Sequence, residues 1–131
     1  MSGKRILVVE DGPLVAFALA ASLVDAGCIV IGPAGTVAEA KRLIEEAQFD
    51  GALLDANLTG EAVDEVAAIL NRRNVPFAFV TGGTREDLPA AFSGAPMLAK
   101  PFTEKDLIAT VGRLFGDAVD ATFRSQSTGA A

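Results

Sequence analysis

The sequence contains no histidine, tryptophan or tyrosine among its 131 residues. Without histidine, a catalytic triad built on histidine, a histidine metal ligand and a phosphohistidine transfer site are excluded. The single cysteine, Cys28, excludes an intrachain disulfide and indicates a reducing compartment. No apolar run reaches the roughly 18 residues of a membrane span, and the first residues lack the apolar core of a signal peptide. We therefore expect a cytoplasmic protein with no membrane partner.

Basic residues are also few, with 11 Lys and Arg against 17 Asp and Glu and a net charge of −6. Nucleic-acid binding depends on a basic surface that neutralises phosphates, so we expect no nucleic-acid partner. Half of the residues are hydrophobic, which excludes general disorder. The length fits one domain, which we place at residues 1–116. The small, polar residues 117–131 are expected to form a flexible tail.

Five short apolar runs are typical of strands that are buried on both faces, as in a parallel sheet. These runs are residues 6–9, 28–31, 51–55, 77–80 and 97–99. Gly32-Pro33 is expected to break the second run. Residues 84–95 show no clear period and contain Pro89, which favours a short or irregular helix.

Helical patterns lie between these runs. Thr36 with Glu39, and Thr103 near Asp106, fit helix N-terminal caps. Pro13 opens the first helix, and the helix between residues 61 and 73 is expected to bury Val63, Val66, Ala67 and Leu70. The first helix is expected to face the core through Leu14, Phe17, Ala18 and Ala21.

Alternating strands and helices predict an α/β fold, a doubly wound five-stranded parallel sheet of the flavodoxin-like (βα)5 type. Its common strand order is 2-1-3-4-5, and ligands bind at the carboxyl ends of the strands where the order reverses. Glu10 and Asp11 follow the first strand, Asp55 ends the third, and Thr81 and Lys100 end the fourth and fifth. We expect these five side chains to gather at one sheet edge.

Clustered carboxylates repel each other unless a cation joins them, and Mg²⁺ prefers such oxygen ligands. An aspartate beside Mg²⁺ can attack a phosphoryl group, while a lysine neutralises the transferring charge. Taken singly, each of these residues has an ordinary interpretation, because acids before a helix complement its dipole and a lone Lys100 is usually solvated. The joint placement at the correct strand ends favours a site.

The matching segments and their order resemble the receiver domain of two-component response regulators over residues 4–114. The segments are Val8-Val9-Glu10-Asp11, Leu53-Leu54-Asp55, Val80-Thr81-Gly82 and Lys100-Pro101-Phe102. The resemblance implies that Asp55 accepts phosphate from a histidine kinase. It also implies a Mg²⁺ site at Glu10, Asp11, Asp55 and the backbone carbonyl of Asn57.

The same resemblance implies that Thr81 is the switch hydroxyl, that Lys100 contacts the phosphate, and that the Lys100-Pro101 bond is cis. Two positions depart from the usual receiver pattern. Thr59 stands four residues after the acceptor, where proline is usual. Met97 stands three residues before the lysine, where an aromatic residue is usual.

The stretch Phe79-Val80-Thr81-Gly82-Gly83-Thr84 and the short segment that follows resemble the FATGUY receivers of alphaproteobacteria. Members of that subgroup are often single-domain proteins linked to HWE-type or related histidine kinases. We hypothesise that Gly82-Gly83 and ordering of residues 84–95 carry the switch here.

The sequence thus favours a single-domain response regulator that acts as a switch or phosphate sink through protein contacts. Its partners would be a kinase and a downstream target or phosphotransferase, and its only catalysis would be its own phosphorylation and dephosphorylation. A pseudo-receiver that works without phosphate remains an alternative. An Asp-nucleophile phosphatase is a weaker one, because that family places an acid where Asn57 stands. A flavin or dinucleotide fold lacks the stacking aromatics or the G-x-G-x-x-G motif.

Overall fold

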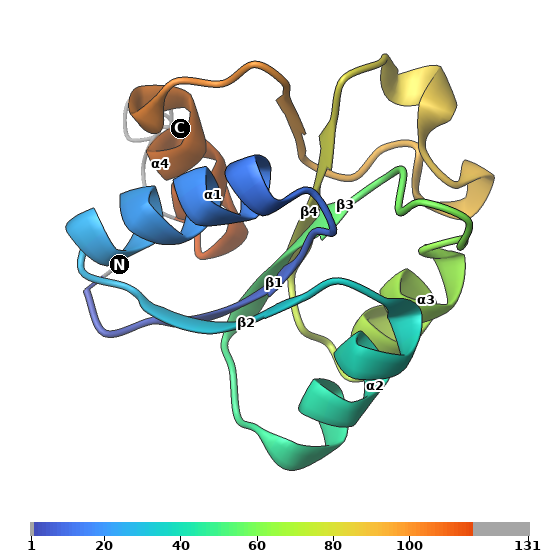
Figure 1. The fold of residues 1–131 in the computed structure, drawn as a ribbon, viewed down its shortest axis with the longest axis horizontal. Helices are drawn as coiled ribbons and strands as arrows, with labels where there is room; N and C mark the ends of the chain where they lie inside the picture. The colour runs from blue at the N-terminus through green and yellow to red at the C-terminus, as the bar shows by residue number, and fades with distance from the viewer. Residues whose placement is uncertain (1, 117–131) are drawn as a thin grey trace.

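The computed structural model describes residues 2–116 as a five-stranded parallel sheet between two helical layers (Figure 1). The strands are β1 (Arg5–Val9), β2 (Ile29–Ala34), β3 (Gly51–Asp55), β4 (Phe77–Thr81) and β5 (Met97–Ala99). The helices are α1 (Pro13–Asp25), α2 (Val37–Glu46), α3 (Asp64–Arg72) and α4 (Glu104–Leu114). The sheet order is β2-β1-β3-β4-β5, which confirms the predicted fold and topology. The predicted tail, residues 117–131, lies outside the described residues, and the boundary at residue 116 stays a prediction.

Each face of the sheet carries its own core. Helices α1 and α4 cover one face, and α2 and α3 cover the other (Figure 1). Neighbouring residues of β3 point to opposite sides, as the period of a strand requires. Leu53 belongs to the core under α1 and α4, and Leu54 to the core under α2 and α3. The three central strands are therefore buried on both sides, as their continuous apolar runs predict.

The local capping signals are also present. The Thr36 hydroxyl accepts a hydrogen bond from the Glu39 N–H at 3.0 Å, while the Glu39 carboxylate accepts from the Gly35 N–H at 2.8 Å. Thr103 and Asp106 form a complete reciprocal capping box at the start of α4. Helix α3 begins at Asp64, and the apolar residues expected to be buried there are buried.

Within the described part of the chain, no helix is both long and apolar enough to cross a membrane.

Strand β2 does not break at Gly32-Pro33 as expected, but continues to Ala34. The Gly32-Pro33 bond is cis, Gly32 has a φ of +99°, and the pairing with β1 shifts register between Leu7 and Val9. The strand survives because it is an edge strand that pairs only with β1, and a proline is tolerated at an edge or a bulge. The expected strand order 2-1-3-4-5 already places this strand at the edge, where a proline does not require a break.

The orientation predicted for α1 is wrong. The helix packs against the sheet through Ala16, Leu19 and Leu23. The predicted core residues lie on its outer side, where Leu14 is 85% exposed and Phe17 is 74% exposed. The helix carries no charged side chain before Asp25, so both of its faces are apolar. Hydrophobic periodicity therefore could not distinguish the buried face from the exposed one.

The segment after β4 is irregular, as predicted. It forms two 3₁₀ turns, Arg85–Asp87 and Ala90–Phe92. The first turn begins with a capping box between Thr84 and Asp87. The Arg85 guanidinium donates to the carbonyls of Ser93, at 3.1 Å, and Ala95, at 2.7 Å, which closes the segment into a loop.

Candidate functional site

Three carboxylates meet where β1 and β3 end. Glu10 and Asp11 follow β1, Asp55 is the last residue of β3, and the two strands pair side by side. One oxygen from each residue lies within 4.8 Å of the others, as expected from the strand order. This cluster lies at the point where the order of the sheet reverses, which is where doubly wound sheets bind ligands.

Glu10 is buried, at only 3% exposure. Its Oε2 accepts a hydrogen bond from the Gly12 N–H at 3.0 Å. Its Oε1 is buried and accepts no hydrogen bond from residues 2–116, although Lys100 Nζ lies 3.3 Å away. Burial raises the pKa of Glu10; the Gly12 N–H opposes this rise, and the neighbouring Asp55 adds to it. Within the described part of the chain, this buried carboxylate oxygen therefore has an ion-pair partner but no hydrogen-bond donor.

The loop after β3 is tied to the same cluster. Asp55 Oδ1 accepts a hydrogen bond from the Asn57 N–H at 2.9 Å, and Asp11 Oδ2 accepts one from the Thr59 N–H at 2.9 Å. Hydrogen bonds from Thr59 lower the pKa of Asp11, so its carboxylate is held in the charged form. The two aspartates thus fix the path of the loop that contains Asn57.

Thr59 was not predicted as a site residue, although its position was noted as unusual. A proline, which receivers usually carry there, has no N–H to donate to Asp11. Threonine supplies this donor. The departure from the family pattern therefore adds a direct contact between the loop and the acidic cluster, and the missing proline was the signal in the sequence that could have revealed it.

Lys100 and Thr81 complete the edge of the sheet. Lys100 Nζ lies 3.6 Å from Asp55 Oδ1, and its backbone N–H donates to the Thr81 carbonyl at 2.8 Å. The Lys100-Pro101 bond is cis, as expected. Thr81 is fully buried, and its Oγ1 accepts a hydrogen bond from the Gly83 N–H at 3.0 Å. The structure thus brings the lysine to the carboxylates and turns the threonine hydroxyl toward the glycine pair.

The donor set fits a hard divalent cation. Glu10, Asp11 and Asp55 supply carboxylate oxygens, and Glu10 Oε1 lacks a hydrogen-bond donor among the residues described. Mg²⁺ is held in proteins by one or two carboxylates together with waters and phosphate oxygens. It would relieve the repulsion between the three acids. These residues can therefore hold such an ion.

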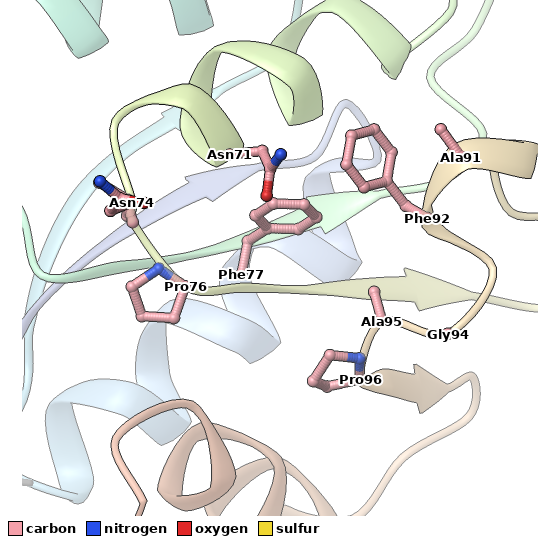
Figure 2. A pocket seen from close by; sticks show the side chains of 10 residues that line it. Asn71, Asn74, Pro76, Phe77, Ala91, Phe92, Gly94, Ala95 and Pro96 are labelled. Atoms are coloured by element: carbon pink, nitrogen blue, oxygen red, sulfur yellow. The ribbon is translucent and has the colours of Figure 1, made fainter.

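A cavity lies elsewhere, at the opposite end of β4. It has a volume of about 450 Å³ and is lined by the turn after α3 and by the second 3₁₀ turn (Figure 2). Phe77 forms its floor, and the Phe92 ring meets it edge-on with the ring centroids 5.5 Å apart. Because Phe77 is the first residue of β4, this cavity is separated from the acidic cluster by the length of the strand.

The fold and the cluster together define a flavodoxin-like α/β domain with an acidic site at the switch point of its sheet. Within that class, the chain belongs to the response regulator receiver domain family, whose model matches residues 6–112. The family resemblance read from the sequence is confirmed. Receivers of this family are signalling domains of bacterial two-component systems, and they bind Mg²⁺ at the acidic site.

Solved structures support this assignment. SdrG from Sphingomonas melonis Fr1 is 38% identical, with a TM-score of 0.79 over 88% of this chain and 99% of SdrG. The receiver domain of the sensor histidine kinase PA1611 from Pseudomonas aeruginosa is 30% identical, with a TM-score of 0.72 over 88% of this chain and 99% of that domain. In that structure, magnesium is coordinated in the active-site cleft.

Curated relatives extend beyond the region they share with this chain. The transcriptional regulatory protein PdtaR of Mycobacterium tuberculosis is 31% identical over 82% of this chain and 55% of its own length. The phyllosphere-induced regulator PhyR of Methylorubrum extorquens is 32% identical over 83% of this chain and 42% of its own length. The chain thus spans about half the length of the curated relatives it matches.

Proposed function

We propose that this chain accepts a phosphoryl group on Asp55 from a histidine kinase and acts in a phosphorelay as a switch or phosphate sink. The observation that carries the proposal is the position of Asp55, which lies within reach of two further carboxylates and 3.6 Å from Lys100 Nζ. A nucleophilic carboxylate between a cation site and an ammonium group is suited to phosphoryl transfer.

In the proposed mechanism, an oxygen of Asp55 attacks the phosphorus and the bond to the leaving group breaks. Glu10, Asp11 and Asp55 would hold Mg²⁺, with the backbone carbonyl of Asn57 as the remaining protein ligand. When bound, the ion supplies positive charge at the transferring group. Lys100, which forms ion pairs with Glu10 and Asp55, would add its ammonium charge at the same site. The chain would act only on itself and would turn over no separate metabolite.

Thr81 would report the phosphorylated state. Its Oγ1 accepts from the Gly83 N–H, so a hydroxyl that turned to bond a phosphoryl oxygen would release that N–H. Release would act on the loop that begins at Gly82-Gly83 and continues into residues 84–95. With Met97 in place of the usual aromatic, this loop would carry the switch.

The proposal includes a kinase partner, of the HWE type by resemblance to the FATGUY subgroup, and a downstream protein or phosphotransferase. Output would pass through residues 84–95, β5 and α4. A related structure supports an activated state, since SdrG has been solved in a BeF₃-activated conformation. A cytoplasmic location without nucleic-acid or membrane partners belongs to the same proposal.

Incubation with acetyl phosphate and Mg²⁺, followed by intact mass, tests the acceptor. The wild-type chain should gain one phosphoryl group and Asp55→Asn should gain none. Asp64→Asn is the matched control, because Asp64 is an exposed acid in the first turn of α3 and should leave the modification unchanged. Phosphorylation of Asp55→Asn would move the acceptor to another residue, and an unmodified wild type would favour the phosphate-independent pseudo-receiver.

A further inference from the structure

We propose that Thr59 is a positioning residue, which holds the Asp11 carboxylate in the orientation in which it binds a divalent cation. Thr59 acts through Asp11 and does not itself bind the cation. The inference deepens the proposed function and rests on one part of it, since it takes the cluster of Glu10, Asp11 and Asp55 as the cation site. It does not require Asp55 to be phosphorylated.

The first observation is that Asp11 is the one member of the cluster that is not buried. Glu10 and Asp55 are each 3% exposed, whereas Asp11 is half-buried at the rim. A carboxylate at the rim can turn out to water, and fixing such a side chain costs conformational entropy. Asp11 therefore benefits from a contact that holds it against the other two acids.

The second observation is that Thr59 supplies this contact from a distant part of the chain. Its backbone N–H donates to Asp11 Oδ2 at 2.9 Å, across 48 positions of the sequence. The hydroxyl and the N–H of Thr59 both lower the pKa of Asp11, so both stabilise the charged carboxylate. Hydrogen bonds to a charged acceptor are about twice as strong as neutral ones.

The third observation is that the loop holding Thr59, residues 56–63 between β3 and α3, is anchored without Asp11 (Figure 1). Leu58 is 4% exposed and belongs to the core under α2 and α3. Glu61 Oε1 accepts a hydrogen bond from the Val37 N–H, at the start of α2, at 2.7 Å. Thr59 lies between these two anchors, so loss of its donors frees the Asp11 side chain more than it frees the loop.

The orientation that Thr59 holds is also the one that places Asp11 in the cluster. With Oδ2 bonded to Thr59, an oxygen of Asp11 lies within 4.8 Å of an oxygen from each of Glu10 and Asp55. Mg²⁺ demands a nearly regular arrangement of its oxygen ligands. Groups that hydrogen-bond to a metal ligand and orient it typically change the metal affinity by 10–100-fold. Loss of the Thr59 donors should therefore weaken cation binding.

Titration of the full chain with MgCl₂, followed by backbone amide NMR, tests this role. Thr59→Pro lacks both the N–H and the hydroxyl, and it should raise the dissociation constant for Mg²⁺ about tenfold or more. Thr59→Val retains the N–H and should raise it about fivefold, the usual effect of one hydrogen bond. Thr59→Ser retains both donors and should bind Mg²⁺ like the wild type.

Thr36→Ala is the matched control for a general loss of stability. The Thr36 hydroxyl caps α2 by accepting from the Glu39 N–H at 3.0 Å, away from the acidic cluster. Its loss should lower the thermal midpoint without changing the affinity for Mg²⁺. Thr59→Pro should do the reverse in EDTA, keeping the circular dichroism spectrum of the wild type. If Thr59→Pro fails to fold, Thr59→Val decides.

A wild type that does not bind Mg²⁺ would overturn the inference, and so would Thr59 variants that bind it as tightly as the wild type or more tightly. Binding by Thr59→Ser as weak as that by Thr59→Pro would also overturn it, because the donors would then not be the cause. Phosphorylation of Asp55, measured separately by intact mass, distinguishes the two proposals. A chain that shows the expected Thr59 dependence but gains no phosphoryl group would refute the proposed function and leave this inference in place.

Discussion

The acidic cluster of Glu10, Asp11 and Asp55 holds more negative charge than the side chain of Lys100 can neutralise. Glu10 is buried with one oxygen that accepts no hydrogen bond from the described residues, and the charged Asp55 lies close by. Lys100 offsets part of this repulsion, at 3.3 Å from Glu10 and 3.6 Å from Asp55. One ammonium group cannot neutralise three carboxylates, so the folded chain should gain stability when a divalent cation binds.

We predict that Mg²⁺ raises the thermal midpoint of the wild-type chain relative to EDTA. A ligand present at 100 times its dissociation constant stabilises the folded state by about 2.7 kcal/mol, which sets the scale of the effect at saturation. Asp11→Asn should reduce the increment by weakening the site. Asp64→Asn should leave it unchanged, since that acid lies outside the cluster. Differential scanning fluorimetry measures both, and an equal increment for Asp11→Asn would place the ion elsewhere.

Individual side chains in the site could be assigned from the sequence because each one follows a strand. A parallel sheet with a known order brings its strand ends together, so Glu10, Asp55 and Lys100 could be placed at one edge before any distance was known. The contact from Thr59 to Asp11 could not be assigned, because it depends on the path of a loop. A backbone N–H has no signature in the sequence, and only the missing proline hinted at it.

At the level of elements, the conformation of the loop after β4 depends on the close approach of the Asp87 carboxylate to Gly83. A Cβ atom added at Gly83 would collide with the carboxylate of Asp87, whereas one added at Gly82 would meet open space. Asp87 accepts a hydrogen bond from the Thr84 N–H at 2.8 Å and thereby caps the first 3₁₀ turn. A side chain at position 83 would therefore displace the Asp87 carboxylate, whereas one at position 82 would not.

We therefore predict that Gly83→Ala displaces Asp87 and loosens residues 84–95. The loss of a cap costs about 1 kcal/mol, so local amide exchange in this segment should accelerate about fivefold. Gly82→Ala is the matched control and should leave the exchange rates close to those of the wild type. Backbone NMR with and without beryllofluoride then tests the switch, because Gly83→Ala should alter the response of this segment. Identical behaviour of the two variants would remove Gly83 from the switch.

The helices also show which elements a sequence specifies locally. The starts of α2 and α4 were predicted because a cap involves residues three positions apart. The orientation of α1 was not, because a helix without charges before Asp25 presents two apolar faces and only the sheet decides between them. The expected break of β2 at Pro33 was wrong for a different reason, since the predicted strand order places β2 at the edge, where a proline is tolerated.

At the scale of the whole molecule, the sheet has a hydrophobic core on each face, and β3 contributes residues to both cores. Leu53 and Leu54 are both fully buried, yet they point to opposite faces. If the domain folds as one unit, a cavity on either side should destabilise the entire structure. If the two layers were independent, each cavity would loosen only the helices above it.

We predict that Leu53→Ala and Leu54→Ala each lower the free energy of unfolding by about 2–5 kcal/mol, the usual range for this deletion in a core. Leu14→Ala removes the same atoms from a side chain that is 85% exposed, and it should change the value by about 0.5 kcal/mol or less in dilute solution. Urea titrations followed by circular dichroism and by methyl NMR from both cores should give coincident transitions in each variant. Separate transitions for the α1–α4 core and the α2–α3 core in Leu53→Ala would contradict a single cooperative unit, because the shared strands would then fail to couple the two faces.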